Sequence, residues 1–254
     1  MNKYRIATWN LDHASNSSRS VALQIEQILS INPDIIVLTE TCEEVDLSKH
    51  GYCGAKTHKN SYGKYYSAIW SKMSIETVFP TYDNITAVCT KLRTDSGCII
   101  IYGTIITYAD DKGFDGKSKR WEEHYKAIEI QGKEWNSFTE AHPDCVFLVA
   151  GDFNQTRDGS KQTYGTKHGR DLLSIQLNKN NLVCLTEDNF GELGKLTPDP
   201  KTSWFRNNID HICISKNDFE LISADAWNHF TNDGIYISDH NGVFVDIVLH
   251  PQNK

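Results

Sequence analysis

The stretch C-V-F-L-V-A-G-D-F-N, residues 145–154, joins an apolar run to a group of polar side chains. A short, fully apolar run of this kind is typical of a strand that is buried on both faces. Gly151 can adopt backbone conformations that other residues rarely reach, so the chain can turn sharply there and aim Asp152 inward. The stretch therefore predicts a buried strand that delivers a carboxylate to a site at its end.

The same arrangement, a polar residue at the edge of an apolar strand, recurs along the chain. The further residues are Asn10 after residues 4–9, Glu40 after residues 35–38, Tyr108 after residues 98–107, Asp210 at the start of residues 209–215, and Asp239 and His240 before residues 242–249. Strand ends meet at one rim of a sheet, where sites are commonly built. We therefore expect these side chains to lie together.

The order of the predicted elements indicates the fold class. Further strands are expected at residues 65–71 and 86–92, and helices at residues 18–30, 120–138 and 172–180. Hairpins alternate with helical crossovers, which favours a four-layer α/β sandwich with two mixed β-sheets packed face to face and helices outside. Because no linker, repeat or low-complexity segment interrupts the chain, we expect one domain over residues 1–254.

The side chains of the expected rim are carboxylates, amides and one imidazole, without a set of thiolates. Hard oxygen donors of this kind suit Mg²⁺ or Mn²⁺ better than zinc. Such an ion neutralises phosphate oxygens, a carboxylate can orient or deprotonate water, and a histidine can stabilise the charge of the transition state. The inventory thus favours phosphoester hydrolysis. A single residue at a strand end is usually a turn residue, but here the whole set recurs at strand edges.

Five short motifs resemble the signature blocks of the endonuclease/exonuclease/phosphatase superfamily, which includes deoxyribonuclease I and exonuclease III. They are T-W-N-L-D at residues 8–12, L-T-E at 38–40, G-D-F-N at 151–154, I-D-H at 209–211 and S-D-H at 238–240. They occur in the superfamily's order, and the likeness extends over nearly the whole chain. The resemblance implies a deoxyribonuclease I-like fold and a metal-dependent phosphoesterase.

The resemblance also implies roles for individual residues near the metal. Glu40 matches the metal-binding glutamate, and Asn10 and Asp239 match groups beside the same ion. Asp12 matches an acid that some branches carry nearby.

The remaining matches concern the attacking water and the phosphate. Asp152 matches the residue that aligns or deprotonates the water, and Asn154 its phosphate-binding neighbour. His240 matches the histidine that contacts phosphate, and Asp210 the acid that orients it. Tyr108 falls where other members carry a tyrosine or histidine in contact with phosphate. His211 would face the other way from Asp210 on a strand, so we expect a structural role for it more than a direct one.

The charge pattern restricts the substrate. The formal net charge is −7, no Lys/Arg-rich run is present, and Cys42, Glu43, Glu44 and Asp46 follow Glu40. An acidic lip beside the metal would repel a long duplex. Trp204, Phe205 and Trp227 either pack in the protein or stack on bases.

These observations favour a phosphodiesterase or nuclease that acts on a nucleotide or a short single-stranded nucleic acid. Two alternatives stay open. The first is a phosphatase of a small phosphoester, such as an inositol phosphate or a phospholipid head group. The second is a non-catalytic binding module of the same fold, which the intact set of motifs disfavours. The oligomeric state does not follow from the sequence.

The cysteines and the N-terminal segment indicate a compartment. Seven cysteines occur without a C-x-x-C pair, and Cys98, Cys145, Cys184 and Cys213 lie in apolar runs. We therefore expect buried free thiols in the reducing cytoplasm. No apolar run reaches the length of a membrane span, and the first residues lack a secretory pattern.

Overall fold

The computed structural model describes residues 3–14, 18–160 and 163–250. Within them, two six-stranded sheets form the centre of the molecule. The first sheet consists, in spatial order, of β11 (Phe219–Trp227), β12 (Gly242–Leu249), β1 (Lys3–Asn10), β2 (Ile35–Thr41), β4 (Tyr65–Ser71) and β3 (Cys53–Lys56). The second consists of β5 (Ile75–Phe79), β6 (Ala87–Thr94), β7 (Gly97–Ile105), β8 (Cys145–Asp152), β10 (Asp210–Ser215) and β9 (Leu182–Cys184).

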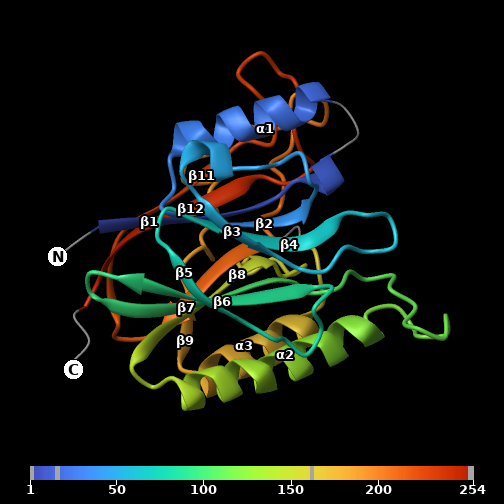
Figure 1. The fold of residues 1–254 in the computed structure, drawn as a ribbon. Coiled ribbons are helices and arrows are strands. Elements are labelled where there is room, and N and C mark those ends of the chain that lie inside the picture. The colour runs from blue at the N-terminus through green and yellow to red at the C-terminus, as the bar shows by residue number, and fades with distance from the viewer. Residues whose placement is uncertain (1–2, 15–17, 161–162, 251–254) are drawn as a thin grey trace.

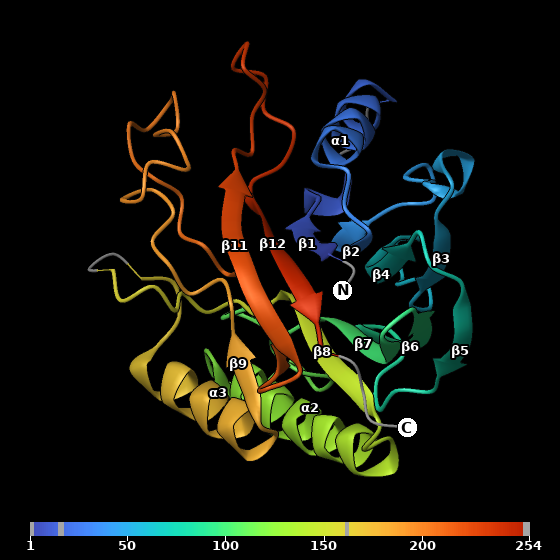
Figure 2. The ribbon, with the colours of Figure 1, turned by 90° about the vertical axis from the view of Figure 1, so that its left-hand side faces the viewer.

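Helices cover the outer faces of the two sheets. They are α1 (Ser18–Ile31), α2 (Glu122–Ala141) and α3 (Lys167–Lys179), and two short 3₁₀ turns occur at Asp12–Ala14 and Ser48–His50. Figure 1 shows α1 outside the sheet that contains β1 and β2, and α2 and α3 outside the sheet that contains β8. Figure 2 shows the same four layers after a quarter turn. The predicted α/β sandwich is confirmed.

Alternating side chains hold these layers together. On β2, Ile35 and Val37 lie in the apolar core between the sheets, whereas Ile36 and Leu38 join the core under α1. On β8, Leu148 likewise faces the other sheet, and its neighbours on either side face α2 and α3. Burying one such aliphatic side chain contributes about 1.5–3 kcal/mol. A central strand therefore has to be apolar on both faces, which explains the continuous apolar runs.

Four strands were not expected from the sequence, namely β3, β5, β9 and β11. The structure places each of them at the edge of a sheet. Only one side of an edge strand is paired, and much of its surface is exposed, as at Leu221 and Ile222 of β11. Such strands carry a weaker apolar signal than central ones.

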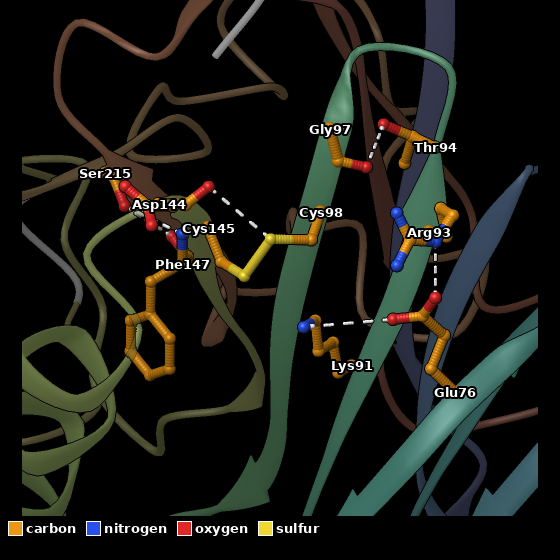
Figure 3. Close-up of a disulfide and its surroundings, with 10 residues drawn as sticks. All are labelled: Glu76, Lys91, Arg93, Thr94, Gly97, Cys98, Asp144, Cys145, Phe147 and Ser215. Atoms are coloured by element: carbon orange, nitrogen blue, oxygen red, sulfur yellow. Dashed lines mark hydrogen bonds and ion pairs between the residues drawn. A yellow bond between two sulfur atoms is a disulfide. The ribbon is translucent and has the colours of Figure 1, made fainter. Parts of the chain in front are cut away.

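The expectation of free thiols is wrong for two of the cysteines. Cys98 and Cys145 form a disulfide, with Cα atoms 4.8 Å apart and a sequence separation of 47. Figure 3 shows this bond joining the starts of β7 and β8. The two residues face each other because the parallel pairing of these strands puts Cys98 opposite Cys145. Because these two cysteines are not free thiols, they no longer support the inference of a reducing cytoplasm.

The strand pairing gathers the ends of the central strands at one rim. β1 pairs in parallel with β2, and Asn10 lies opposite Thr39, directly before Glu40. In the other sheet, Asp152 lies opposite Asp210 on β10. Gly151 permits this approach, since a Cβ atom there would lie 1.8 Å from the carbonyl oxygen of Thr104. A larger residue would push β8 away from β7 just before Asp152.

Candidate active site

Asp152 lies at the centre of the rim, buried at the end of β8. Its Oδ2 atom accepts hydrogen bonds from the side-chain amides of Asn10 at 3.1 Å and Asn154 at 3.3 Å. Its Oδ1 atom accepts the backbone N–H of Asn154 at 2.8 Å. Since Asn10 belongs to one sheet and Asp152 to the other, this contact joins the two sheets at the site.

The environment of Asp152 favours its protonated form in the absence of a cation. Burial raises the pKa of this carboxyl to about 7, and the nearby Asp210 acts in the same direction, while the charge of His240 opposes the rise. A carboxylate whose pKa lies close to neutrality is suited to accept a proton from water near pH 7.

A second pair of side chains lies beside Asp152. The Nδ1 atom of His240 is 2.6 Å from Oδ2 of Asp210, and the ligand-type atoms of Asp152, Asp210 and His240 all lie within 4.8 Å of one another. Burial alone would lower the pKa of His240, but the charges of Asp210 and Asp152 outweigh it and raise the pKa to about 10. His240 is therefore a cation at neutral pH, and it can bind an anionic group.

Hydrogen bonds to β1 fix the segment that carries His240. The hydroxyl of Ser238 donates to the carbonyl of Asn10 at 2.6 Å and accepts the backbone N–H of His240 at 3.0 Å. The indole N–H of Trp9 donates to the carbonyl of His240 at 2.8 Å. The S-D-H motif is thus fastened to the T-W-N motif, although more than 220 residues separate them.

The carboxylates expected near a metal form a second, more open part of the rim. Burial raises the pKa of Glu40, with Asp239 adding to the rise and His13 opposing it. Burial also raises the pKa of Asp12, again with a contribution from Asp239. Asn10 hydrogen-bonds Glu40 and accepts the N–H of Asp12 on its Oδ1 atom at 2.9 Å. These hard oxygen donors fit Mg²⁺ or Mn²⁺.

Within the described ranges, however, the His, Cys, Asp and Glu side chains that gather closely enough to share an ion are Asp152, Asp210 and His240, a group that does not contain Glu40 or Asp239. Asp239 is half-exposed, and its Oδ1 atom lies 3.7 Å from Nε2 of His240. His240 and Asp210 already engage each other through a short hydrogen bond. The rim therefore offers two groups of potential ligands, one around Asp152 and one around Glu40.

His13 is a member of this rim that sequence reasoning did not single out. Its Nε2 atom lies 3.2 Å from Oε2 of Glu40. Both residues have left-handed backbone conformations, with φ of 55° at His13 and 48° at Glu40. Non-glycine residues rarely adopt this conformation, and such residues cluster at functional sites. In the sequence, His13 directly follows the T-W-N-L-D motif, and this position could have indicated that it belongs to the rim.

Tyr108 and His211 have very different surroundings. The side chain of Tyr108 is 55% exposed, so it is free to meet a ligand. His211 is buried, its Nε2 atom donates to the carbonyl of Gln155 at 2.8 Å, and its Nδ1 atom faces the hydroxyl of Thr186 at 3.3 Å. As expected, His211 faces away from the site and holds neighbouring segments together.

The acidic residues that follow Glu40 are less repulsive than their sequence suggests. Glu43 pairs with Lys59 and also accepts a hydrogen bond from the hydroxyl of Tyr65. Asp46 accepts the backbone N–H of Ser48 at 3.0 Å. Of these acids, Glu43 is thus paired with a cation, whereas Glu44 is exposed.

Comparisons with known proteins identify the family and the fold of the chain. Residues 7–240 match the model of the Endonuclease/Exonuclease/phosphatase family. A comparison with curated protein sequences found no match. Across the described residues, none of the helices combines the length and the apolar character that crossing a membrane requires.

Several solved structures share the fold. The human Nocturnin catalytic domain, with a bound sulfate anion, is 18% identical, with 97% of this chain and 94% of that chain covered and a TM-score of 0.64. The 3′ phosphatase NExo from Neisseria, bound to a product DNA hairpin, is 15% identical, with 95% and 98% covered and a TM-score of 0.68. The endonuclease domain of TRAS1, a telomere-specific non-LTR retrotransposon, is 16% identical, with 99% and 100% covered and a TM-score of 0.64.

The family match spans most of the chain, and the two-sheet fold is the one that these structures share. The chain therefore belongs to the endonuclease/exonuclease/phosphatase family and is a phosphoesterase.

Proposed function

We propose that the protein is a phosphodiesterase that hydrolyses a nucleotide or a short single-stranded nucleic acid with the aid of Mg²⁺ or Mn²⁺. The observation that carries this proposal is the setting of Asp152. Its buried carboxylate is held by two amide donors and lies beside the Asp210–His240 pair. A carboxylate that is held in one orientation, and whose pKa lies near neutral pH, can position water and accept its proton.

The other side chains of the site receive roles from their contacts. Asn10 and Asn154 fix the orientation of Asp152, and the side-chain amide of Asn154 also donates to the carbonyl of Ile106 at 2.8 Å. His240, as a cation, contacts the phosphate and stabilises the charge that develops on it. Asp210 holds the ring of His240 and its proton at Nδ1. Tyr108, with its exposed hydroxyl, is a further contact for the phosphate.

Glu40, Asn10 and Asp239 would hold the divalent cation. Members of this family use such ions, and the oxygen donors of these residues suit magnesium or manganese. When bound, the ion supplies positive charge to the phosphate oxygens. Burial raises the pKa of Glu40 although His13 and His240 oppose the rise, and a bound cation would favour its ionised form.

The segment at residues 201–207 supports a substrate that carries bases. It is exposed throughout and contains Lys201, Trp204, Phe205 and Arg206. Trp204 is 63% exposed and Phe205 is 43% exposed, so both rings can be reached from solvent. Cations beside aromatic faces suit the phosphates and bases of a single strand. Trp227, by contrast, is buried against Trp9 and Phe244 and has no such role.

A phosphatase of a small phosphoester is the second candidate. The net charge of −7 and the exposed Glu44 favour it, because a long polyanion would be repelled. An inositol phosphate or a phospholipid head group would meet less repulsion than a duplex. The two candidates share the chemistry around Asp152 and differ only in what the surrounding loops bind.

A panel of substrates separates the two candidates. We would incubate the protein with short single-stranded DNA and RNA, dinucleotides, duplex DNA, inositol phosphates and phospholipid head groups, each with Mg²⁺, Mn²⁺ or EDTA. The proposal predicts metal-dependent cleavage of the nucleotides and single strands, and Asp152→Asn serves as the inactive control. Release of phosphate from inositol phosphates or head groups alone would favour the second candidate. No turnover of any member with either metal would contradict both.

A further inference from the structure

A chain of buried hydrogen bonds connects the segment at residues 201–207 with the segment that carries His240. The Nε2 atom of His229 lies 3.0 Å from Oδ2 of Asp199, and its Nδ1 atom lies 2.8 Å from Oδ1 of Asn241. All three side chains are buried. We call these residues the Asp199–His229–Asn241 bridge. None of them contacts Asp152, and the sequence motifs do not include His229 or Asp199.

The ring of His229 lies between two oxygen acceptors. The Oδ1 atom of Asn241 also accepts the backbone N–H of His229 at 3.0 Å, so this atom is the amide oxygen and an acceptor. The Tyr236 hydroxyl holds the pKa of Asp199 well below its usual range, so its carboxylate is charged. The two ring nitrogens of His229 are thus held between the amide oxygen of Asn241 and the carboxylate of Asp199.

At one end, the bridge organises the exposed segment. Oδ1 of Asp199 accepts the backbone N–H groups of Lys201 at 2.8 Å and Thr202 at 3.2 Å. The backbone N–H of Asp199 donates to the carbonyl of Trp204 at 2.9 Å. The guanidinium of Arg206 also approaches Asp199, at 3.9 Å. The buried carboxylate thus sets the turn from which Trp204, Phe205 and Arg206 project.

At the other end, the bridge organises the catalytic segment. The carbonyl of His229 accepts the backbone N–H groups of Ile237 at 2.9 Å and Ser238 at 3.2 Å. The side chain of His229 holds Asn241, which directly follows His240. His240 is therefore fixed from both sides, by Ser238 and by Asn241. Figure 2 shows the two segments, which precede β10 and β12, projecting on the same side of the sheets.

We propose that His229 is a positioning residue that, through Asn241 and Asp199, sets the placement of His240 relative to the substrate-binding segment at residues 201–207. The proposal rests on the proposed function for the identity of that segment's ligand. Such a bridge suits this task, because buried hydrogen bonds are directional and hold their partners in one arrangement. A histidine with a packing role alone would not need hydrogen bonds to Asn241 and Asp199.

The first test examines the Asp199–His229–Asn241 bridge in the protein without any substrate. Hydrogen exchange should be compared between the wild type, Asn241→Ala and Asn180→Ala. Asn180 is a matched control because it is equally buried and donates to the carbonyls of Gly132 and Gln176, away from the bridge.

Asn241→Ala removes one acceptor and leaves the contact of His229 with Asp199 in place, so the fold should persist. We expect the amides of Lys201 and Thr202 to exchange at least about tenfold faster in Asn241→Ala than in Asn180→Ala. Asn241 does not touch these amides, so a change there reports transmission through His229. Equal exchange in the two variants would overturn the proposal.

The second test measures the kinetics of hydrolysis of a phosphoester that the wild type cleaves. Asn241→Ala should lower kcat by up to about 100-fold, the scale of a small misplacement of a catalytic group. It should also raise KM for a substrate that carries a base, but not for the base-free diester bis(p-nitrophenyl) phosphate. Asn241→Asp, which keeps the acceptor, should restore most of the loss. Wild-type inactivity toward all phosphoesters would contradict the proposed function, whereas unchanged kcat in Asn241→Ala would contradict the bridge.

Discussion

The Nδ1 atom of His240 lies 2.6 Å from Oδ2 of Asp210, although 30 residues separate them in the sequence. The other carboxylate oxygen of Asp210 is buried without a hydrogen-bond partner among the described residues. The imidazolium is thus the main compensation for the buried negative charge of Asp210. This pairing keeps His240 charged beside Asp152. The ionisation of His240 and that of Asp152 therefore affect each other.

The pH dependence of turnover should show two limbs. Burial raises the pKa of Asp152 to about 7, so below this pH the carboxyl is protonated and cannot accept a proton from water. The pKa of His240 is raised to about 10, so its positive charge is lost only above that pH. We expect kcat to rise toward neutrality and to fall near pH 10. A bound cation favours the ionised carboxylate and should move the lower limb to more acidic pH. A rate that falls between pH 6 and 8 would contradict this assignment.

Replacing Asp152 with asparagine should remove most of the turnover. The amide cannot take a proton from water, and the loss of a general base typically costs on the order of 10²-fold or more. Substrate affinity should change little. His240→Ala should also reduce turnover strongly, and Asp210→Asn more mildly, because it leaves the ring in place. Single-turnover hydrolysis by variants with matching circular dichroism is the measurement. Near wild-type rates in Asp152→Asn would leave the G-D-F-N motif with a structural role only.

Removal of the metal should abolish activity, and Glu40→Gln should weaken metal binding without unfolding the protein. The exchange keeps the size of the side chain and removes the negative charge that attracts a cation. Calorimetric titration with Mg²⁺ and Mn²⁺ should show weaker binding in Glu40→Gln. Glu44→Gln is a suitable control, since Glu44 is exposed on the adjoining turn. Equal affinity in both variants, or full activity in EDTA, would exclude Glu40 as a ligand.

The Cys98–Cys145 disulfide should stabilise the fold and leave the chemistry intact. Its 47-residue separation corresponds to a stabilisation of about 4 kcal/mol from the restricted unfolded chain. Reduction should therefore lower Tm, whereas Asp152 lies at the opposite end of β8 and its contacts should persist. Thiol titration of the unfolded protein should give five thiols before reduction and seven after it. Seven thiols without reductant would show that the bond does not form.

The central strands and the polar side chains of the candidate site were recognisable from local sequence. Apolar runs such as residues 35–38 and 145–150 can only be accommodated between two layers, and a polar residue directly after them must lie at a sheet edge. β4 and β12 begin and end where they were predicted. Asp152, Asn154, Asp210 and His240 do lie together, with Asn10 joining them from the other sheet.

What the sequence by itself determined is therefore the set of buried strands and the chemistry at their ends, because both follow from local patterns of apolar and polar residues. Only the tertiary structure decided which distant residues meet. The pairing of Cys98 with Cys145 depends on the register of β7 with β8, and the contacts of His229 depend on two loops with no regular pattern. Such contacts arise from the packing of whole sheets and loops, and no local periodicity encodes them.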